Sequence, residues 1–536
     1  MNKPLAVIVL VLAVCAAGCG ACRTEAPAVP ADRLRAIEPF DPAAMSAPET
    51  PPSAEPVLST ETSLSLEECR ADALAHNLDL KVALLSPTIA AEAVNEAEAR
   101  FEASLFSGLG FARVDSPPFG AAPSAQGETT DANLGVDIPL RTGGTLTFES
   151  RATRFDEDAS GWSSDFAASI SHPLLRGAGP AANCYEIRVA RYESQISQAE
   201  AKLSVMRVIS ELDRTYWRTY AARRELDVRR NEHSLAVAQL ERARRRVQAG
   251  AAGEVEITRA ETGVAEKLEA VILAENAIRQ SERDLKRAIN RPGLPMDSPT
   301  AVITATPPDP VHYRLDGTRL VAAGVANRME MLEVELQIAR DAATIDFARN
   351  DTLPYLALDY TYGASGRGAD SDESFTVLNE KRYEDHTVSL TLDLPLGNAA
   401  ARSRLRQALA SRIQRLATRE LRRSQIEQEV LNALDELETS WQRLLANRQR
   451  TILAARNLDA ETRQYELGLR TSTDVLDAQT RLANAQSAEI SSLVDYQVAQ
   501  IDLAYATGTL LGAAKIRWEP APIDGDAAPA SNRNPR

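Results

Sequence analysis

The cysteines near the N-terminus are the residues whose type and spacing first suggest chemistry. Cys19 and Cys22 form a CxxC pair, a spacing that occurs in metal and redox sites. The sequence has no second CxxC pair, so a metal or redox role for these thiols is disfavoured. The pair follows a short basic start and an apolar run from Leu5 to Val14, which is too short to cross a bilayer as a helix. This arrangement is typical of an export signal.

Cys19 is the predicted attachment point of a lipid. Ala16-Ala17-Gly18-Cys19 resembles a bacterial lipobox, in which the cysteine is lipidated and becomes the mature N-terminus, although Ala16 stands where Leu is usual. An ordinary cleaved signal that leaves Cys19 free is the alternative. Gly20 replaces the Asp that marks inner-membrane retention, which fits the outer membrane. We expect a signal peptide over 1–18 and an extended Pro/Ala-rich tether over 19–62.

The other reactive residue types predict no enzyme, cofactor or metal site. None of the five histidines has a second histidine or a cysteine at ligand spacing; they are His76, His172, His233, His312 and His386. The sequence contains no GxSxG, Walker-type or HExxH motif. With 60 basic against 75 acidic residues the net charge is −15. Nucleic acid is therefore not an expected partner, because proteins that bind it usually present a basic surface.

The largest elements expected in the chain come from two stretches that contain neither Gly nor Pro. Residues 181–249 and 399–467 each run for 69 residues. As helices they would be about 100 Å long, at about 1.5 Å per residue. Apolar residues recur at steps of three and four, as from Ile426 through Val430 and Leu434 to Leu437. Such a stripe buries one narrow helix face against neighbouring helices, so side-by-side long helices are expected.

Both stretches end at glycine, and the sequence that follows is repeated. Gly250 and Gly468 suit the left-handed conformation that closes a helix. The segments after them align without a gap at an offset of 218, so that Glu256 corresponds to Asp474. The sequence therefore predicts two halves, each with the order helix, strands, long helix and return helix. The halves are 63–317 and 318–512, with opening helices over 73–100 and 320–349 and a flexible tail over 513–536.

Between the opening helix and the long helix, each half contains alternating apolar and polar residues. Leu134, Val136 and Ile138 alternate with Gly135 and Asp137. Period-two alternation fits a strand of a soluble sheet, or of a membrane barrel with its apolar side outward; the export signal and the long helices favour the barrel. The expected strands are 105–114, 131–138, 145–155 and 165–172, then 355–362 and 388–394, with a turn at 141–144 and polar extracellular loops over 115–130 and 365–385.

The junctions and the closing segment resemble those of a known family. His172-Pro173-Leu174-Leu175-Arg176-Gly177 and Leu394-Pro395-Leu396-Gly397 open the two long helices. The segment 465–482, YELGLRTSTDVLDAQTRL, continues through Asp495-Tyr496 to Gly508 and carries the most specific pattern. Together these motifs resemble the TolC-like outer-membrane efflux family, and the resemblance covers roughly residues 63–512.

The resemblance implies an α+β membrane protein with duplicated halves. It implies a homotrimer whose strands form one β-barrel in the outer membrane and whose long helices form a periplasmic α-helical barrel. Each half of a family member typically gives two strands, whereas four candidates occur in the first half here. The implied function is a passive conduit across the outer membrane and periplasm, working with a periplasmic adaptor protein and an inner-membrane pump, in contact with outer-membrane lipid.

The helical tips are the candidate functional surface, because in the family the tips meet the adaptor. The candidate tip, adaptor or gate residues are Gly250, Glu256, Gly468, Leu469 and Asp474. Two roles fit Asp474: an acidic ring at the gate, or a helix cap, since Thr471-Ser472-Thr473-Asp474 is a capping-box pattern. We favour the cap. The arginines of the preceding turns fit either an adaptor contact or a solvated face; they are Arg242, Arg244, Arg245 and Arg246.

Two other functions are alternatives to a conduit that carries small molecules or metals. One is the outer-membrane channel of a type I protein secretion system, which the lipid anchor disfavours weakly. The other is a lipid-tethered periplasmic coiled-coil scaffold with a soluble strand domain. A scaffold does not require repeated strand blocks that lead into paired long helices, so we rank it below the channel.

Overall fold

A computed structural model places residues 61–116, 125–156, 161–251 and 253–517 of the chain. These residues belong to one compact unit, Ser59–Arg536. The predicted signal peptide, Cys19 and nearly all of the predicted tether and tail lie outside the described residues. The predicted C-terminal boundary of the tether is wrong, because Glu61–Leu64 forms strand β1. β1 pairs in parallel with β6 (Ala301–Thr304), and this pairing joins the start of the first half to its end.

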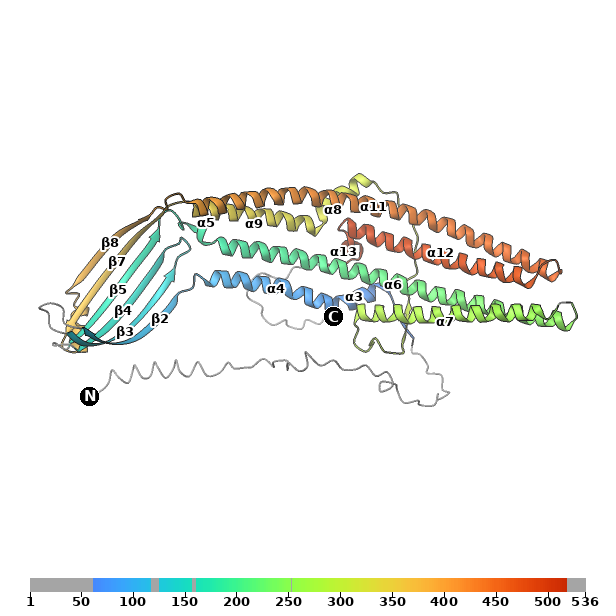
Figure 1. Cartoon of the computed structure of the whole chain (residues 1–536), viewed down its shortest axis with the longest axis horizontal. Coiled ribbons are helices and arrows are strands. Elements are labelled where there is room, and N and C mark those ends of the chain that lie inside the picture. The colour runs from blue at the N-terminus through green and yellow to red at the C-terminus, as the bar shows by residue number, and fades with distance from the viewer. Residues whose placement is uncertain (1–60, 117–124, 157–160, 252, 518–536) are drawn as a thin grey trace, which may run out of the picture. The chain divides into compact units, whose positions relative to one another are not determined.

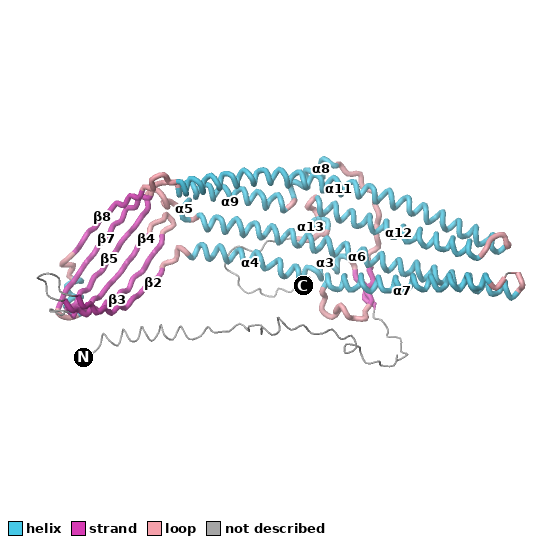
Figure 2. Tube along the Cα trace, in the orientation of Figure 1, coloured by secondary structure: helices cyan, strands magenta, loops and turns pink. Residues whose placement is uncertain are grey.

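Six strands form one antiparallel sheet in which the strands stand in chain order, with β6 left out because it pairs with β1 (Figures 1 and 2). They are β2 (Ser104–Ser116), β3 (Ala125–Pro139), β4 (Thr145–Asp156), β5 (Gly161–Pro173), β7 (Tyr355–Gly368) and β8 (Glu384–Asp393). The four strands predicted for the first half are therefore confirmed, and so is the turn between β3 and β4. The two strands per half implied by the resemblance are wrong for the first half.

The register gives the sheet one apolar and one polar face. Ile138, Leu146, Ile170, Tyr360 and Val388 are successive partners across five strands, and so lie on one side. Their chain neighbours Asp137, Thr147, Ser169, Thr361 and Thr387 are likewise partners on the other side. Directly opposed partners in an antiparallel pair lie on the same face of the sheet, because successive side chains along each strand point to opposite faces.

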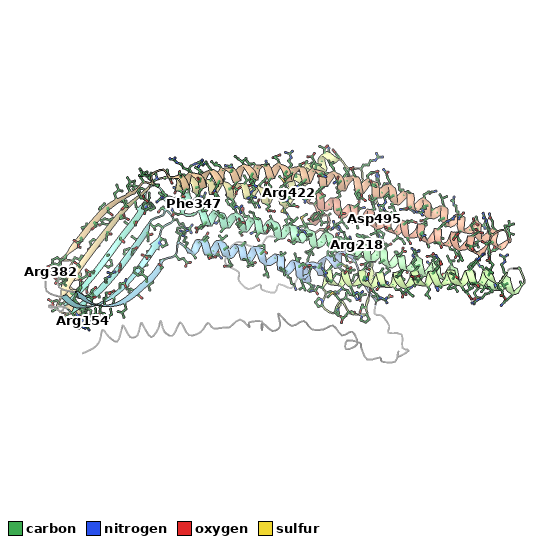
Figure 3. The ribbon with its side chains drawn as sticks, in the orientation of Figure 1. Arg154, Arg218, Phe347, Arg382, Arg422 and Asp495 are labelled. Carbon is green, nitrogen blue, oxygen red and sulfur yellow. The ribbon has the colours of Figure 1, made fainter. Side chains whose placement is uncertain are left out.

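Charged residues interrupt the apolar face only at the end of the sheet remote from the helices, as far as the described strands extend. Arg113 and Glu128 are partners there and form an ion pair at 3.3 Å. Arg154 lies at the same end, as does Arg382 of the loop before β8 (Figure 3). Strands that are apolar on one face and polar on the other have the pattern of a barrel wall whose apolar face meets lipid.

The main helices repeat the same order in both halves. The first half contains α3 (Leu66–His76), α4 (Leu78–Ala99), α5 (Pro180–Asn183), α6 (Tyr185–Gln248) and α7 (Val255–Ile289). The second contains α8 (Gly317–Asn327), α9 (Met329–Asp351), α10 (Ser371–Asn379), α11 (Ala399–Glu466), α12 (Ser472–Ala506) and α13 (Leu510–Ala513). The long helices α6 and α11 have 64 and 68 residues, and each returns as a helical hairpin with α7 or α12 (Figure 1).

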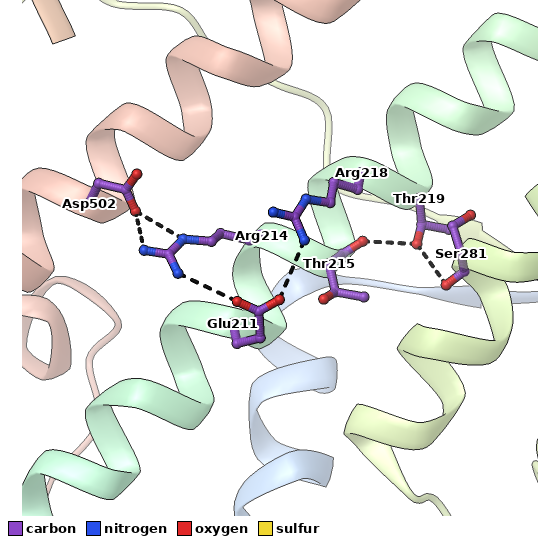
Figure 4. Close-up of polar contacts among 7 residues, drawn as sticks. All are labelled: Glu211, Arg214, Thr215, Arg218, Thr219, Ser281 and Asp502. Carbon is purple, nitrogen blue, oxygen red and sulfur yellow. Dashed lines mark hydrogen bonds and ion pairs between the residues drawn. The ribbon is translucent and has the colours of Figure 1, made fainter. Parts of the chain in front are cut away.

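The two hairpins pack on each other through α6 and α12. The core at this contact contains Ile209, Leu212 and Tyr216 of α6, all at most 1% exposed, and Val494 of α12. Polar contacts flank it: Arg214 Nε donates to Asp502 Oδ1 of α12 at 3.0 Å, while Thr219 donates to the Ser281 carbonyl of α7 at 3.2 Å (Figure 4). Helix α6 therefore contacts both its own return helix α7 and helix α12 of the second hairpin.

Each opening helix is broken in two, which the sequence prediction missed. Asn77 interrupts the first: its Oδ1 accepts the Leu80 N–H at 2.9 Å and its Nδ2 donates to the Ala288 carbonyl at 2.9 Å. Arg328 interrupts the second, where its extended backbone lets a nearly buried guanidinium pair with Glu330 and Glu429. In both cases a tertiary partner outweighs local helix propensity.

Both predicted extracellular loops are partly wrong. Strand β2 continues to Ser116 and strand β3 begins at Ala125, so strands occupy both ends of the first predicted loop. Residues 117–124 are not among the described residues. The second loop contains the end of β7, helix α10 and the start of β8. Polar residues can belong to these strand ends because the strands are held together there by inter-strand backbone hydrogen bonds, which do not require apolar burial. In the described parts of the chain, no helix has the length and apolar character to cross a membrane.

Candidate functional site

The tips of the two helical hairpins contain all the candidate residues inside the described chain. Gly250 and Gly468 have φ angles of 68° and 76°, the left-handed conformation expected of a helix-closing glycine. Each tip has the paired closing bonds of a Schellman motif. In the first, Gly250 N–H donates to Val247 O at 2.9 Å and Ala251 N–H to Arg246 O at 2.8 Å. In the second, the N–H groups of Gly468 and Leu469 donate to Tyr465 O and Gln464 O at 3.0 and 2.9 Å.

Asp474 caps the start of α12. Its Oδ2 accepts bonds from the Thr471 N–H at 2.9 Å and the Thr471 hydroxyl at 2.8 Å, and the Thr471 Oγ1 accepts the Asp474 N–H in return. The bonds from Thr471 hold the pKa of this carboxyl below its usual value. This geometry supports the cap that the sequence pattern favoured, and both carboxylate bonds stay within one turn of the same chain segment.

Glu256, the counterpart of Asp474 in the repeat, has a different partner. Its Oε2 accepts hydrogen bonds from the hydroxyl and the backbone N–H of Ser472, the latter at 3.4 Å. Its Oε1 pairs with Arg259 at 3.2 Å. Glu256 therefore links the start of α7 to the start of α12 across the two hairpins, although the sequence alignment gave the two acids equivalent positions.

A second contact joins the hairpins at the ends of their long helices. Arg246 of α6 donates to the Tyr465 carbonyl of α11 at 3.2 Å, and its guanidinium lies 4.6 Å from the Tyr465 ring centroid. A cation over an aromatic face within about 6 Å is attractive. Arg244 instead pairs within its own hairpin, with Glu241 and Glu261 at 3.0 Å each. Only one of these two arginines therefore bridges the tips.

A buried charge network lies further along the hairpins and was not predicted. Glu232 of α6 is 3% exposed and pairs with Arg229 at 2.9 Å and with Lys267 of α7 at 2.8 Å. Lys267 also donates to Thr480 of α12 at 2.9 Å. Nothing in the sequence separates Glu232 from the many solvated glutamates of a long helix; only the packing of three helices around it reveals its role.

Leu469 is exposed at the second tip. Its side chain is 72% accessible, and Leu467 beside it is 74% accessible. Two accessible leucines on either side of Gly468 give this tip an apolar surface next to the polar bridge. Gly468 itself lies beside the other hairpin, since a Cβ built on it would be 3.9 Å from Arg246.

Among the residues that the structure describes, no group of three or more His, Cys, Asp and Glu side chains is arranged to hold a metal ion. The thiols of Cys69 and Cys184 are free, and burial raises the pKa of Cys69 to about 12. A buried thiol held protonated is unreactive at neutral pH.

Comparisons with known proteins identify relatives by sequence and by fold. Residues 321–509 match the family model described as outer membrane efflux protein. The chain is 27% identical to the outer membrane protein TolC of Salmonella enteritidis over 209 residues, covering 37% of this chain and 42% of the relative. It is 24% identical to that of Vibrio cholerae over 328 residues, covering 59% and 72%. The sequence match thus spans less than half of the Salmonella relative.

Solved structures share the fold over most of the chain. The Campylobacter jejuni CmeC outer membrane channel matches with a TM-score of 0.63 at 15% identity, covering 89% of this chain and 93% of that one. The open state of the Neisseria gonorrhoeae MtrE outer membrane channel matches with a TM-score of 0.61 at 17% identity, covering 83% and 89%. The fold class predicted from the sequence, long helices with an antiparallel sheet in duplicated halves, is confirmed.

Proposed function

We propose that this chain, which belongs to the outer membrane efflux protein family, is the outer-membrane channel subunit of a tripartite efflux system. Its place is the bacterial outer membrane. The family is one of conduits and not of enzymes. In this proposal the protein is a passive duct that crosses the outer membrane and periplasm, and the driving force comes from an inner-membrane pump.

The observation that carries the proposal is the two-faced sheet with free edges. Strands β2 and β8 are the outermost strands of the sheet, and among the described residues each pairs on one side only. Unpaired backbone groups are not tolerated in lipid, so a sheet with a lipid-facing side must close by pairing its edges. We infer that three copies close one barrel, β2 of one protomer against β8 of the next, with polar side chains toward the lumen.

The tips are the proposed gate and adaptor surface. The bridges from Glu256 to Ser472 and from Arg246 to Tyr465 connect the two hairpins of one protomer, so opening the helical end requires the hairpins to separate. The exposed leucines beside Gly468 offer an apolar contact for the periplasmic adaptor. In the same proposal Gly250 and Gly468 shape the tips, and Asp474 keeps α12 capped while its neighbours move.

Lipidation of Cys19 is part of the proposal, since an anchored N-terminus keeps the chain at the outer membrane. Growth with labelled palmitate is expected to label the full chain and not the Cys19→Ser variant. Label that remains in the variant would overturn this assignment, whereas the channel function does not depend on it.

Two measurements test the function itself. The protein is purified from outer membranes in detergent and its mass determined, and a trimer is expected; a monomer would overturn the channel. The trimer is then placed in a planar bilayer, where ion conductance is expected. A stable trimer that never conducts, even with both tip bridges removed, would favour the tethered scaffold.

A further inference from the structure

The hairpin of β3 and β4 has no counterpart in the second half of the chain. In the second half, β7 follows α9 directly and β8 leads into α11, so two strands connect the opening helix to the long helix. In the first half, β2 follows α4 and β5 leads into α5 and α6, and β3 and β4 lie between them. β2 therefore corresponds to β7, because each follows the opening helix, and β5 corresponds to β8, because each leads to the long helix. The hairpin 125–156 is then an insertion between β2 and β5.

The inserted hairpin is a full part of the sheet. β3 pairs with β2 over thirteen residues, from Ser104↔Asp137 to Ser116↔Ala125, and with β4 over twelve. On the polar face Thr147 donates to Asp137 at 2.6 Å and Asn133 to Glu149 at 3.2 Å. Phe106 of β2 fills the space above Gly135, where a Cβ would lie 2.3 Å from its ring. The hairpin is thus fixed to its neighbour by side chains as well as by backbone bonds.

The hairpin also has the same two faces as the rest of the sheet. Leu134, Val136 and Ile138 of β3, and Leu146 and Phe148 of β4, continue the apolar face. The opposite face of the hairpin is polar and carries Asp131, Asn133, Asp137, Thr147, Glu149 and Arg151. A hairpin that lay in water, or that folded into the lumen, would not need an apolar side that continues that of the sheet, so both of its strands belong in the lipid-facing wall.

We propose that the inserted hairpin widens the outer-membrane pore by giving each protomer six wall strands, so that a trimer closes an 18-stranded barrel instead of a 12-stranded one. This rests on the proposed function. With strands about 4.8 Å apart and tilted by about 40°, 18 strands give a backbone diameter of about 36 Å, against about 24 Å for 12. Barrels of this strand number leave an open aqueous lumen, so the membrane section admits bulky solutes.

The experiment compares the full chain with a variant that lacks residues 125–156, in which 117–124 and 157–160 connect β2 to β5. The deletion preserves the sheet's order, because β2 and β5 run antiparallel. It also preserves the faces, since Ser104 of β2 and Ser169 of β5 both lie on the polar face, in the same row and with two strands between them. Electron cryomicroscopy of each trimer is expected to show 18 strands in the full chain and 12 in the variant.

A labelling experiment measures lumen width independently of the gate. Ser169→Cys places a thiol on the polar face of β5, in a background without Cys22, Cys69 and Cys184, and trimers in nanodiscs are treated with maleimide-polyethylene glycols of increasing size. The largest polymer that reacts is expected to be smaller in the deletion variant, by about a third in diameter. Ile170→Cys, on the apolar face of the same strand, is the matched control and is expected to be protected by lipid.

The outcomes separate this inference from the proposed function. A conducting trimer whose full-length barrel has 12 strands, with the hairpin outside the wall, overturns the widened pore and leaves the channel intact. Equal polymer cut-offs for the two proteins also overturn it. A monomer, or a trimer without a lumen, overturns the proposed function itself. If the deletion variant does not fold, the strand count of the full chain decides alone.

Discussion

Glu256 at the start of α7 accepts hydrogen bonds from both the hydroxyl and the backbone N–H of Ser472 at the start of α12. One carboxylate thus ties the two hairpin tips together, with Arg246 and Tyr465 as a second tie. Ser472 is fully buried, whereas the rest of its tip is largely exposed. The link is therefore sheltered from water, and a charged acceptor in such a bond contributes more than a neutral one.

Replacing Glu256 with Gln is expected to loosen the tips. The amide keeps the size of the side chain but loses the charge, so the bond from Ser472 weakens by about 1 to 2 kcal/mol. Single-channel conductance of the reconstituted trimer should rise, and rise further when Arg246→Ala is added. The matched control is Glu254→Gln, since Glu254 is exposed and makes no side-chain capping bond. Equal conductance in all variants would show that these bridges do not restrain the pore.

Asp474→Ala is expected to fray the start of α12 without opening the pore. Amide hydrogen exchange of the first turn after Thr471 should speed up, because the variant loses the carboxylate half of the capping box. Because the pKa of Asp474 is lowered, its contribution to the stability of the helix start is fully present at a pH above the usual aspartate pKa. That contribution is lost as the pH falls below this range. Wild-type exchange should therefore approach that of the variant in acid. A conductance increase as large as that of Glu256→Gln would instead support a gate role for Asp474.

Removing the guanidinium of Arg70 is expected to destabilise the junction of α3 and α6. Arg70 Nε and Nη2 bind the two oxygens of Asp213 at 2.9 and 2.7 Å, and Asp213 is fully buried. Arg70→Met leaves that carboxylate unpaired, at a cost of about 3 to 5 kcal/mol. The double variant Arg70→Met with Asp213→Leu should recover most of the loss in denaturant unfolding. A double variant no more stable than the single one would contradict this account.

The pH dependence of that variant has a defined sign. Burial raises the pKa of Asp213 even with Arg70 present, and removal of the cation raises it further. A raised carboxyl pKa favours the folded state at low pH, and this advantage is lost as the pH rises through the folded pKa. The stability of Arg70→Met relative to wild type should therefore improve as the pH is lowered from neutral.

Gly366→Ala is expected to displace α10 from the sheet. A Cβ on Gly366 would lie 2.1 Å from the Ser374 carbonyl oxygen and 2.5 Å from the Leu378 nitrogen, both backbone atoms that cannot rotate away. Limited proteolysis between 369 and 383 should become faster. Gly363→Ala on the same strand is the control, because its Cβ would meet Asp385 at an ordinary 3.7 Å. Faster cleavage in both variants would point to general weakening of β7 instead.

The sequence predicted the parts of the structure that local chemistry controls. The long helices follow from two stretches free of Gly and Pro, and they end within a residue or two of the positions expected from Gly250 and Gly468. The strands of both halves follow from period-two alternation. The capping box at Thr471 and Asp474 follows from the preference of an N-terminal turn for an accepting side chain. Each of these depends on residues that are close together in the chain.

Other features depend on partners far away in the chain, and only the tertiary structure decides them. Asn77 and Arg328 break helices because Ala288 and Glu429 lie beside them. Glu256 and Asp474 are equivalent in the sequence repeat but not in space: one crosses to the other hairpin and the other closes its own helix. Two halves of strands and long helices could be predicted from the sequence, since periodicity and helix ends are local. Which residues join the hairpins, and whether β3 and β4 belong to the same sheet as the rest, depended on the packing of segments that the sequence leaves far apart.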